Sequence, residues 1–323
     1  NYIDAVVFYC NREFQRAVGD ALRDGWREKV VVSTKNNYYG DDEAAWWKNL
    51  EDSLERLQVQ HIDVYNQHGM SWERFTTQYE PHMRPWMQKA KDQGLIGHIC
   101  CSFHDGAEGL LNLVKSEEFS AITLQYNLLN RELEEGIALA HEKNIGVVIM
   151  GPVAGGRLGE PSEVLEQMLP SAPRVPELAL KFVLSNPNVT MALSGMTKMS
   201  DVEENLAATA DFTTLTAEEM ELIEQKMQEM AKLSELYCTG CGYCMPCPAE
   251  VNISGTFDKF NRGNIYGLWD AAKQAYAQQG TVAWDAGKKA DACTDCGACE
   301  EKCPQKIEIR KQLLHAHTAL MAT

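Results

Sequence analysis

Eight of the eleven cysteines stand in two short runs near the end of the sequence. The first run comprises Cys238, Cys241, Cys244 and Cys247, followed by Pro248; the second comprises Cys293, Cys296, Cys299 and Cys303, followed by Pro304. Thiolates are soft metal ligands, and thiolates at every third position wrap a loop around a metal centre. No secretion signal opens the sequence, so the runs predict thiolate metal sites in a reducing cytoplasm rather than disulfides.

The spacing indicates which metal centre the thiolates hold. The second run reads C-x2-C-x2-C-x3-C-P, the bacterial ferredoxin pattern for a [4Fe–4S] cluster, and the first run differs from it by one residue. Structural zinc is the alternative, but zinc modules usually present cysteines in pairs separated by a longer spacer, and the C-P ending has no role there. We therefore predict two [4Fe–4S] clusters.

The fourth cysteine of each run is expected to ligate the cluster of the other run. In two-cluster ferredoxins the cysteine before the proline ligates the other cluster. The predicted ligand sets are Cys238, Cys241, Cys244 and Cys303 for one cluster, and Cys293, Cys296, Cys299 and Cys247 for the other. The spacer of about 45 residues between the runs exceeds that of compact ferredoxins and favours a more helical module.

A second set of reactive side chains follows apolar, strand-like runs in the first part of the chain. Asp4 lies in the first run and Tyr9 follows it, Lys35 ends the second run and His68 ends the third. A lysine ammonium lowers the pKa of a neighbouring tyrosine from about 10, an aspartate holds that lysine, and a histidine can orient a carbonyl. Each residue has an ordinary structural role when taken alone. Four such residues near the ends of three strand-like runs predict a proton-donating site for reducing a C=O bond.

The elements that must position these residues alternate between strands and helices. Strand candidates are 2–8, 29–35, 61–68, 96–103, 121–127, 146–152 and 189–195, and helical patterns cover 13–23, 43–57, 72–93, 106–116, 131–143 and 176–185. Alternation predicts parallel pairing through crossover helices, as in a (β/α)8 TIM barrel, whose chemistry lies at the carboxyl ends of its strands. Seven strands are one short of eight, so we expect a first strand to be missing from this sequence. An open sheet is the alternative.

Further helices are expected from 199 and from 216, and the cysteine-rich tail begins near residue 236. We predict two domains: a barrel over 1–235 and a small, mainly α-helical, ferredoxin-like domain with two [4Fe–4S] clusters over 236–323. In the spacer between the runs, the second half of 255–280 has a helical pattern.

The motifs resemble those of the aldo-keto reductases, and the tail resembles the ferredoxin-fused branch of that family. The resemblance is carried by "NYIDAVVFYC", "VSTK", "LEDSLERLQVQHIDVYNQHG", "LQYNLLNRE", "MGPVAGGRL" and "SGMTKMSDVEENLAA", in the family's order. It implies a (β/α)8 barrel with an Asp–Tyr–Lys–His tetrad. In that tetrad Tyr9 would be the general acid, Lys35 and Asp4 would tune it, and His68 would orient the substrate.

The resemblance also implies a nicotinamide site. Its expected residues here are Ser102, Gln125, Arg157, Lys198, Asp201, Glu204 and Asn205. Three positions depart from the family pattern, namely Phe103, Thr123 and Met150. Asp201 stands where an arginine often grips the 2′-phosphate of NADP, so NADH is favoured over NADPH. The alternative for Asp201 is an ordinary carboxylate at a helix N-terminus.

The bulk composition excludes other classes of protein. Thirty Lys and Arg against 46 Asp and Glu give a formal net charge of −16, which argues against nucleic-acid binding. No apolar run approaches the roughly 20 residues that span a bilayer.

Together these features predict an oxidoreductase that acts on a small carbonyl or alcohol and exchanges electrons with a partner ferredoxin or flavoprotein. Clusters carry one electron and nicotinamide two, so a mediator is needed, and a flavin is not excluded although no flavin motif is recognisable. The alternatives are a nicotinamide-independent reductase that uses cluster electrons, and a non-catalytic electron-transfer subunit of a larger complex.

Overall fold

The computed structural model covers the chain and describes all residues except 8, 160, 173, 211, 236, 237, 239–241, 243, 304–306 and 323. For residues 9, 11 and 231–235 the backbone alone is described. Contacts between Cα atoms divide the chain into two compact units. The first unit comprises Asn1–Ala154 and Phe182–Asp201, and the second comprises Gly155–Lys181 and Val202–Thr323.

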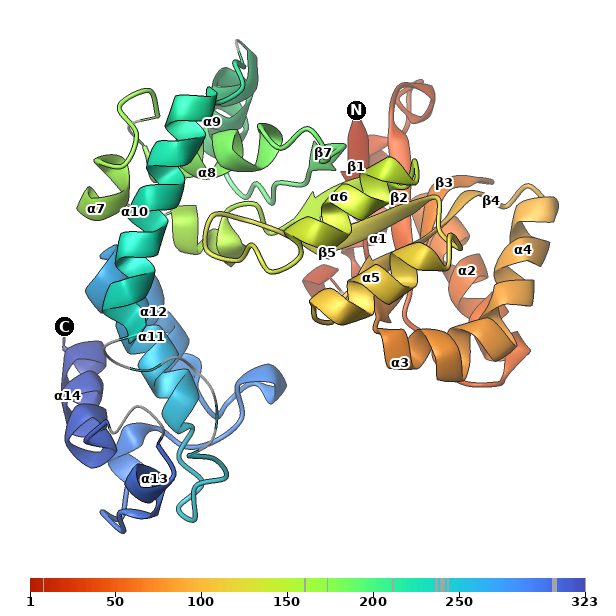
Figure 1. Ribbon diagram of the computed structural model, residues 1–323. Helices are drawn as coiled ribbons and strands as arrows, with labels where there is room; N and C mark the ends of the chain where they lie inside the picture. Colours follow the sequence, from red (N-terminus) through yellow and green to blue (C-terminus); the bar gives the residue numbers. More distant parts are fainter. Residues whose placement is uncertain are drawn as a thin grey trace. The chain divides into compact units, whose positions relative to one another are not determined.

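The first unit is built on a parallel sheet of seven strands that pair in chain order (Figure 1). The strands are β1 (Tyr2–Asp4), β2 (Val31–Asn36), β3 (Ile62–Met70), β4 (Ile96–Phe103), β5 (Ala121–Gln125), β6 (Gly146–Met150) and β7 (Met191–Ala192). Every neighbouring pair is parallel. The seven strands form a half-barrel, and each lies within one of the seven segments expected from the sequence, save that β2 and β3 run one and two residues further.

Burial on both faces explains the near-continuous apolar strands. In β2 all residues after Val31 are buried, and β5 and β6 bury their three central residues. Parallel strands are covered by helices on one face and by the barrel interior on the other, so alternation of apolar and polar residues is lost. Because neighbouring strands are parallel, their carboxyl ends lie at one edge of the sheet, toward which Asp4, Lys35 and His68 are found on β1, β2 and β3.

Helices alternate with the strands of the first unit. They are α1 (Phe14–Ala21), α2 (Glu43–Leu57), α3 (Trp72–Arg74), α4 (Arg84–Asp92), α5 (Ala107–Lys115) and α6 (Glu134–Glu142). Helix α2 begins at Asp42, whose carboxylate accepts hydrogen bonds from the N–H groups of Ala44 and Ala45 at 2.9 and 3.3 Å. Its buried residues, Trp46 among them, recur at helical spacing and hold it against the sheet.

One predicted helix is interrupted. The helical pattern over 72–93 is divided into α3, a π-helical segment η3 (Phe75–Met83) and α4. Pro81 lies inside η3. Because proline has no N–H and its ring clashes with the carbonyl one turn earlier, a regular α-helix does not continue through it, and the wider π turn takes its place.

The second unit is helical. Its longer helices are α9 (Met199–Ala210), which begins in the first unit, α10 (Ala217–Glu235), α11 (Ile253–Tyr266), α12 (Trp269–Gln278) and α14 (Ile309–Met321), and α7 (Glu163–Glu166) and α13 (Ala298–Glu301) are short. Helix α8 (Val175–Leu184) crosses the division between the units. The helix predicted in the second half of 255–280 is confirmed by α12, and α11 occupies the first half, for which no helix was predicted. The domain boundary at 235/236 stays a prediction.

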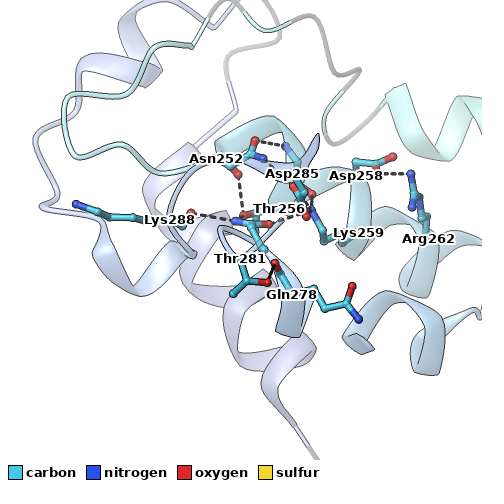
Figure 2. Close-up of polar contacts among 11 residues, drawn as sticks. Asn252, Thr256, Asp258, Lys259, Arg262, Gln278, Thr281, Asp285 and Lys288 are labelled. Atoms are coloured by element: carbon cyan, nitrogen blue, oxygen red, sulfur yellow. Dashed lines mark hydrogen bonds and ion pairs between the residues drawn. The ribbon is translucent and has the colours of Figure 1, made fainter. Parts of the chain in front are cut away.

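A buried polar network joins α11 to the loop before the second cysteine run (Figure 2). The Lys259 ammonium donates to the Gly255 carbonyl at 3.1 Å and to Gln279 Oε1 at 3.0 Å, and it pairs with Asp285 at 3.0 Å. Asn252 Nδ2 also donates to Asp285 at 3.0 Å. The Lys259 side chain is only 6% exposed, so this ion pair is shielded from water and ties the loop at Asp285 to α11.

No helix within the described residues is both long enough and apolar enough to cross a membrane.

Candidate active site and iron–sulfur site

Strand register brings two of the predicted catalytic residues together. Asp4 ends β1 and is paired in register with Ser33 on β2, two residues before Lys35. The Lys35 ammonium forms an ion pair with the Asp4 carboxylate and donates to the Ala5 carbonyl at 3.3 Å. The Ser33 hydroxyl donates to the other carboxylate oxygen of Asp4 at 2.8 Å. Because Lys35 is 4% exposed, its charge is held in place by these oxygens rather than by water.

His68 lies near the end of β3, in the electrostatic field of that lysine. Burial, and then the positive charges of Lys35 and Arg74 and a second histidine, His104, lower the pKa of His68 to about 4. The same burial and the same two cations lower the pKa of His104. The two imidazole rings meet edge to face, with centroids 6.0 Å apart. At neutral pH both histidines are therefore neutral and able to offer a hydrogen bond rather than a charge.

Tyr9, predicted as the general acid, begins the 3-10 turn Tyr9–Arg12 that follows β1. Its side chain lies outside the described part of the structure, so its role stays a prediction.

His104 and Arg74 were missed in the sequence. His104 directly follows the end of β4, so the search for polar residues at strand ends that identified His68 could also have identified His104. Arg74 lies in α3, donates to the Gly69 carbonyl at 2.7 Å and stacks over Tyr39, and no signal in the sequence marks it as part of this site.

The residues expected to bind nicotinamide are distributed over both units. Ser102 is fully buried and accepts a hydrogen bond from the Gly69 N–H at 3.0 Å, and Gln125 ends β5 beside Met150. Lys198 also belongs to the first unit. Arg157, Glu204 and Asn205 belong to the second unit, where Glu204 pairs with Arg174 at 3.0 Å.

Asp201 is engaged by its own loop. Its Oδ2 accepts hydrogen bonds from the N–H groups of Thr197 and Lys198, both at 2.9 Å. These bonds lower the pKa of Asp201 and place its carboxylate in the first turn of α9. This is the ordinary helix-terminal role that the sequence left open.

The second unit gathers cysteines from both runs around one pocket. The pocket is lined by Cys247, Pro248, Val251, Ile253, Cys293, Thr294, Cys296, Gly297, Cys299, Arg310 and Leu313. Four thiols from two runs thus share a wall that is otherwise mostly apolar. Burial first, and then the neighbouring Glu300, Cys293 and Cys247, raise the pKa of Cys299.

This donor set fits a [4Fe–4S] cluster. Four cysteine sulfurs are its usual complement of ligands, and an apolar lining shields the cubane from water. Gly297, with φ of +80°, leaves the wall free of a side chain where the chain turns into α13. Within the described residues, no group of three or more His, Cys, Asp or Glu side chains is arranged around a single metal ion.

The other predicted ligand set is only partly described. Cys241 lies outside the described residues. Cys303 is 7% exposed in the core of the tail, and Cys238 and Cys244 pack against that core. The Cys238 carbonyl accepts a hydrogen bond from Asn261 of α11 at 3.2 Å, which ties the first run to that helix.

Fold and sites together define an oxidoreductase barrel that carries an iron–sulfur module. The aldo/keto reductase family model matches residues 1–175, and a 4Fe-4S dicluster domain model matches residues 237–308. The chain belongs to the aldo/keto reductase family, and its tail is a 4Fe-4S dicluster domain.

Relatives and solved structures agree with this assignment. An NADH-specific methylglyoxal reductase of Escherichia coli (strain K12) is 27% identical, covering 64% of this chain and 78% of its own. The holo form of the aldo-keto reductase AKR11C1 from Bacillus halodurans is 28% identical, with a TM-score of 0.60, covering 70% of this chain and 81% of its own. An aldo/keto reductase from Klebsiella pneumoniae in complex with NADP and acetate is 25% identical, with a TM-score of 0.58, covering 70% and 79%.

Proposed function

We propose that the barrel reduces a small carbonyl compound, or oxidises the corresponding alcohol, with Tyr9 as the general acid. The observation that carries this proposal is the shielded pair of Lys35 and Asp4 at the sheet edge that also holds His68. A fixed ammonium favours the tyrosinate that remains after proton donation, and a neutral imidazole can donate to a substrate oxygen. Such a site stabilises the negative charge that develops on a carbonyl oxygen.

Nicotinamide, when bound, supplies the hydride for this reaction. Ser102 and Gln125 are the proposed contacts in the first unit, with Lys198, Arg157, Glu204 and Asn205 for the phosphate and adenine portions. We favour NADH because an Asp201 carboxylate repels a 2′-phosphate, and the E. coli relative is named as NADH-specific. The Klebsiella relative holds NADP, so the experiment must compare both cofactors.

The dicluster domain, when loaded, supplies one-electron transfer to or from a partner such as ferredoxin or a flavoprotein. We propose that Cys293, Cys296, Cys299 and Cys247 hold one cluster, and Cys238, Cys241, Cys244 and Cys303 the other. Cys296 is exposed, which gives the first of these sites an approach from solvent. Because hydride chemistry moves electrons in pairs, the two activities require a mediator, for which a bound flavin is a candidate.

A second candidate function is a reductase that takes electrons from the clusters without nicotinamide. The specific observation that favours it is the replacement of family contacts by Phe103, Thr123 and Met150. Of these, Phe103 has no hydrogen-bonding group in its side chain, and both Phe103 and Thr123 are buried in the sheet.

Anaerobic assays of the loaded protein decide between these functions. Methylglyoxal and related small aldehydes are offered with NADH, NADPH or reduced ferredoxin, and flavin is sought in the acid extract. Turnover with NADH that exceeds turnover with NADPH supports the proposal. Turnover with reduced ferredoxin alone supports the second candidate, and absence of turnover with every donor leaves the role of an electron-transfer subunit.

A further inference from the structure

A positively charged side chain lines the pocket that is formed in part by Cys247, Cys293, Cys296 and Cys299. Arg310, the second residue of α14, lines this pocket together with the four cysteines. It lies just beyond the segment that the dicluster domain model matches, which ends at residue 308.

The guanidinium of Arg310 is held in position by two carboxylates. Its Nη2 pairs with Glu300 at 2.8 Å, and its Nη1 pairs with Asp295 at 3.3 Å. Glu300 also accepts a hydrogen bond from the Arg310 backbone N–H at 3.0 Å. Both carboxylates belong to the second cysteine run itself, Asp295 immediately before Cys296 and Glu300 immediately after Cys299. These ion pairs and this hydrogen bond hold Arg310 against the loop that carries three of the proposed ligands.

One donor of this guanidinium has no assigned acceptor. Arg310 Nε is buried and makes no hydrogen bond within the described part of the chain. A buried donor without a partner costs free energy, so its persistence beside a thiol-lined pocket calls for an acceptor there. Cysteine thiolates and the sulfides of an iron–sulfur cluster are negatively charged acceptors.

We propose that Arg310 donates from Nε to a sulfur of the [4Fe–4S] cluster held by Cys247, Cys293, Cys296 and Cys299, and thereby raises the reduction potential of that cluster. Reduction adds one electron and forms or breaks no covalent bond, so a fixed positive charge and a hydrogen bond to sulfur both favour the reduced form. Removing Arg310 also leaves Glu300 and Asp295 unpaired near the cluster, which disfavours added negative charge. The inference rests on the ligand set proposed above and is independent of the carbonyl chemistry.

The test is an anaerobic redox titration of the full-length loaded protein with dithionite, followed by electron paramagnetic resonance. In Arg310→Met we expect one of two couples to shift to lower potential while the other stays in place. The expected change is about tenfold in the ratio of reduced to oxidised cluster at a fixed potential, the size of one hydrogen bond to a charged group. For a one-electron couple this is about 59 mV.

Two further variants separate charge from hydrogen bonding. Arg310→Lys keeps the positive charge and loses Nε, so we expect a smaller shift of the same sign. Lys311→Met removes an equal charge from the adjacent, 75% exposed position on α14, where Lys311 pairs with Glu308 at 2.9 Å, and should move neither couple.

Iron and sulfide content distinguish failure of this inference from failure of the ligand assignment. Unchanged potentials in Arg310→Met with full iron content would overturn the inference, as would an equal shift in Lys311→Met. If Arg310→Met loses iron but Arg310→Lys keeps its full iron content, the potential of Arg310→Lys is the test. A shift to lower potential supports the inference, and no shift or a shift to higher potential overturns it. Loss of iron in both variants would show that Arg310 only holds the ligand loop in shape, which also overturns the inference. A wild-type protein with fewer than two clusters would instead refute the ligand sets.

Discussion

Cys247 and Cys299 line the same pocket although they belong to different cysteine runs. The chain between them folds into α11 and α12, and these helices pack with α14 into the core of the tail. The long spacer is therefore a folded element that returns the second run to the end of the first. This arrangement supports a shared ligand set and makes the pairing of cysteines testable by combining substitutions.

Cys247→Ser should remove one cluster and lower the iron content from about eight to about four per chain. If Cys247 serves the second run, Cys247→Ser combined with Cys299→Ser should lose no more iron than either single variant. Cys247→Ser combined with Cys303→Ser should lose both clusters. If instead the iron losses of Cys247→Ser and Cys299→Ser add in the double variant, Cys247 would belong to the cluster of its own run.

Tyr9→Phe should lower kcat for carbonyl reduction by about 10²- to 10⁴-fold, because a positioned general acid contributes that much to proton transfer. The absorption spectrum of the clusters should not change. Tyr38→Phe, which removes a hydroxyl from the loop after β2, is the control and should keep most of the activity. Full turnover in Tyr9→Phe would contradict the assigned acid and favour an electron-transfer subunit.

Asp4→Asn should destabilise the first unit by about 3 kcal/mol, because it leaves the ammonium of Lys35 buried without a counter-charge. The two side chains are 15% and 5% exposed, respectively. Asp20→Asn breaks the exposed pair with Arg23, whose side chains are more than half exposed, and should cost less than about 1 kcal/mol. Urea unfolding followed by tryptophan fluorescence compares the two variants. Equal losses would show that Lys35 is reached by water.

The stability of the protein should rise with pH between about 4 and 6.5 in part through His68. Its folded pKa of about 4 lies below the ordinary 6.5, so the unfolded chain binds more protons in this window. The contribution is complete above pH 6.5 and is lost as the pH falls toward 4. His68→Gln should therefore reduce the difference in the free energy of unfolding between pH 5 and pH 7, measured by urea unfolding. The difference that remains should include the contribution of His104. His141→Gln, at an exposed position on α6, is the control variant.

Lys259→Met should destabilise the tail by about 3 kcal/mol, because Asp285 then loses its buried partner in the network of Figure 2. The cluster absorbance should bleach at a lower temperature than in the unaltered protein. Lys288→Met removes an exposed ion pair with Glu250, at 2.7 Å, and should cost less than about 1 kcal/mol. If both variants bleach at the same temperature, the network does not hold the ligand loop.

The sequence predicted more of the fold than of the sites. Strand ranges and parallel pairing follow from local apolar patterns, and all seven strands pair in chain order. The division of the helix at η3 was not predicted, because the pattern over 72–93 is periodic despite Pro81 and the backbone adjusts only locally. The helical first half of the spacer was missed because Gly255 and Gly263 weaken the local preference, whereas burial of Phe257 and Phe260 stabilises α11.

The sequence by itself determined the chemistry of the side chains. Cysteine spacing predicts iron–sulfur ligation, and the types of residue at strand ends predict a proton-donating site, because ligand and acid–base properties belong to the residues themselves. The tertiary structure decided which residues meet. Lys35 is joined to Asp4 by strand register, His104 comes within range of His68, and Arg310 is brought to the cysteine pocket by α14. These encounters depend on how distant segments pack, and no local pattern records them.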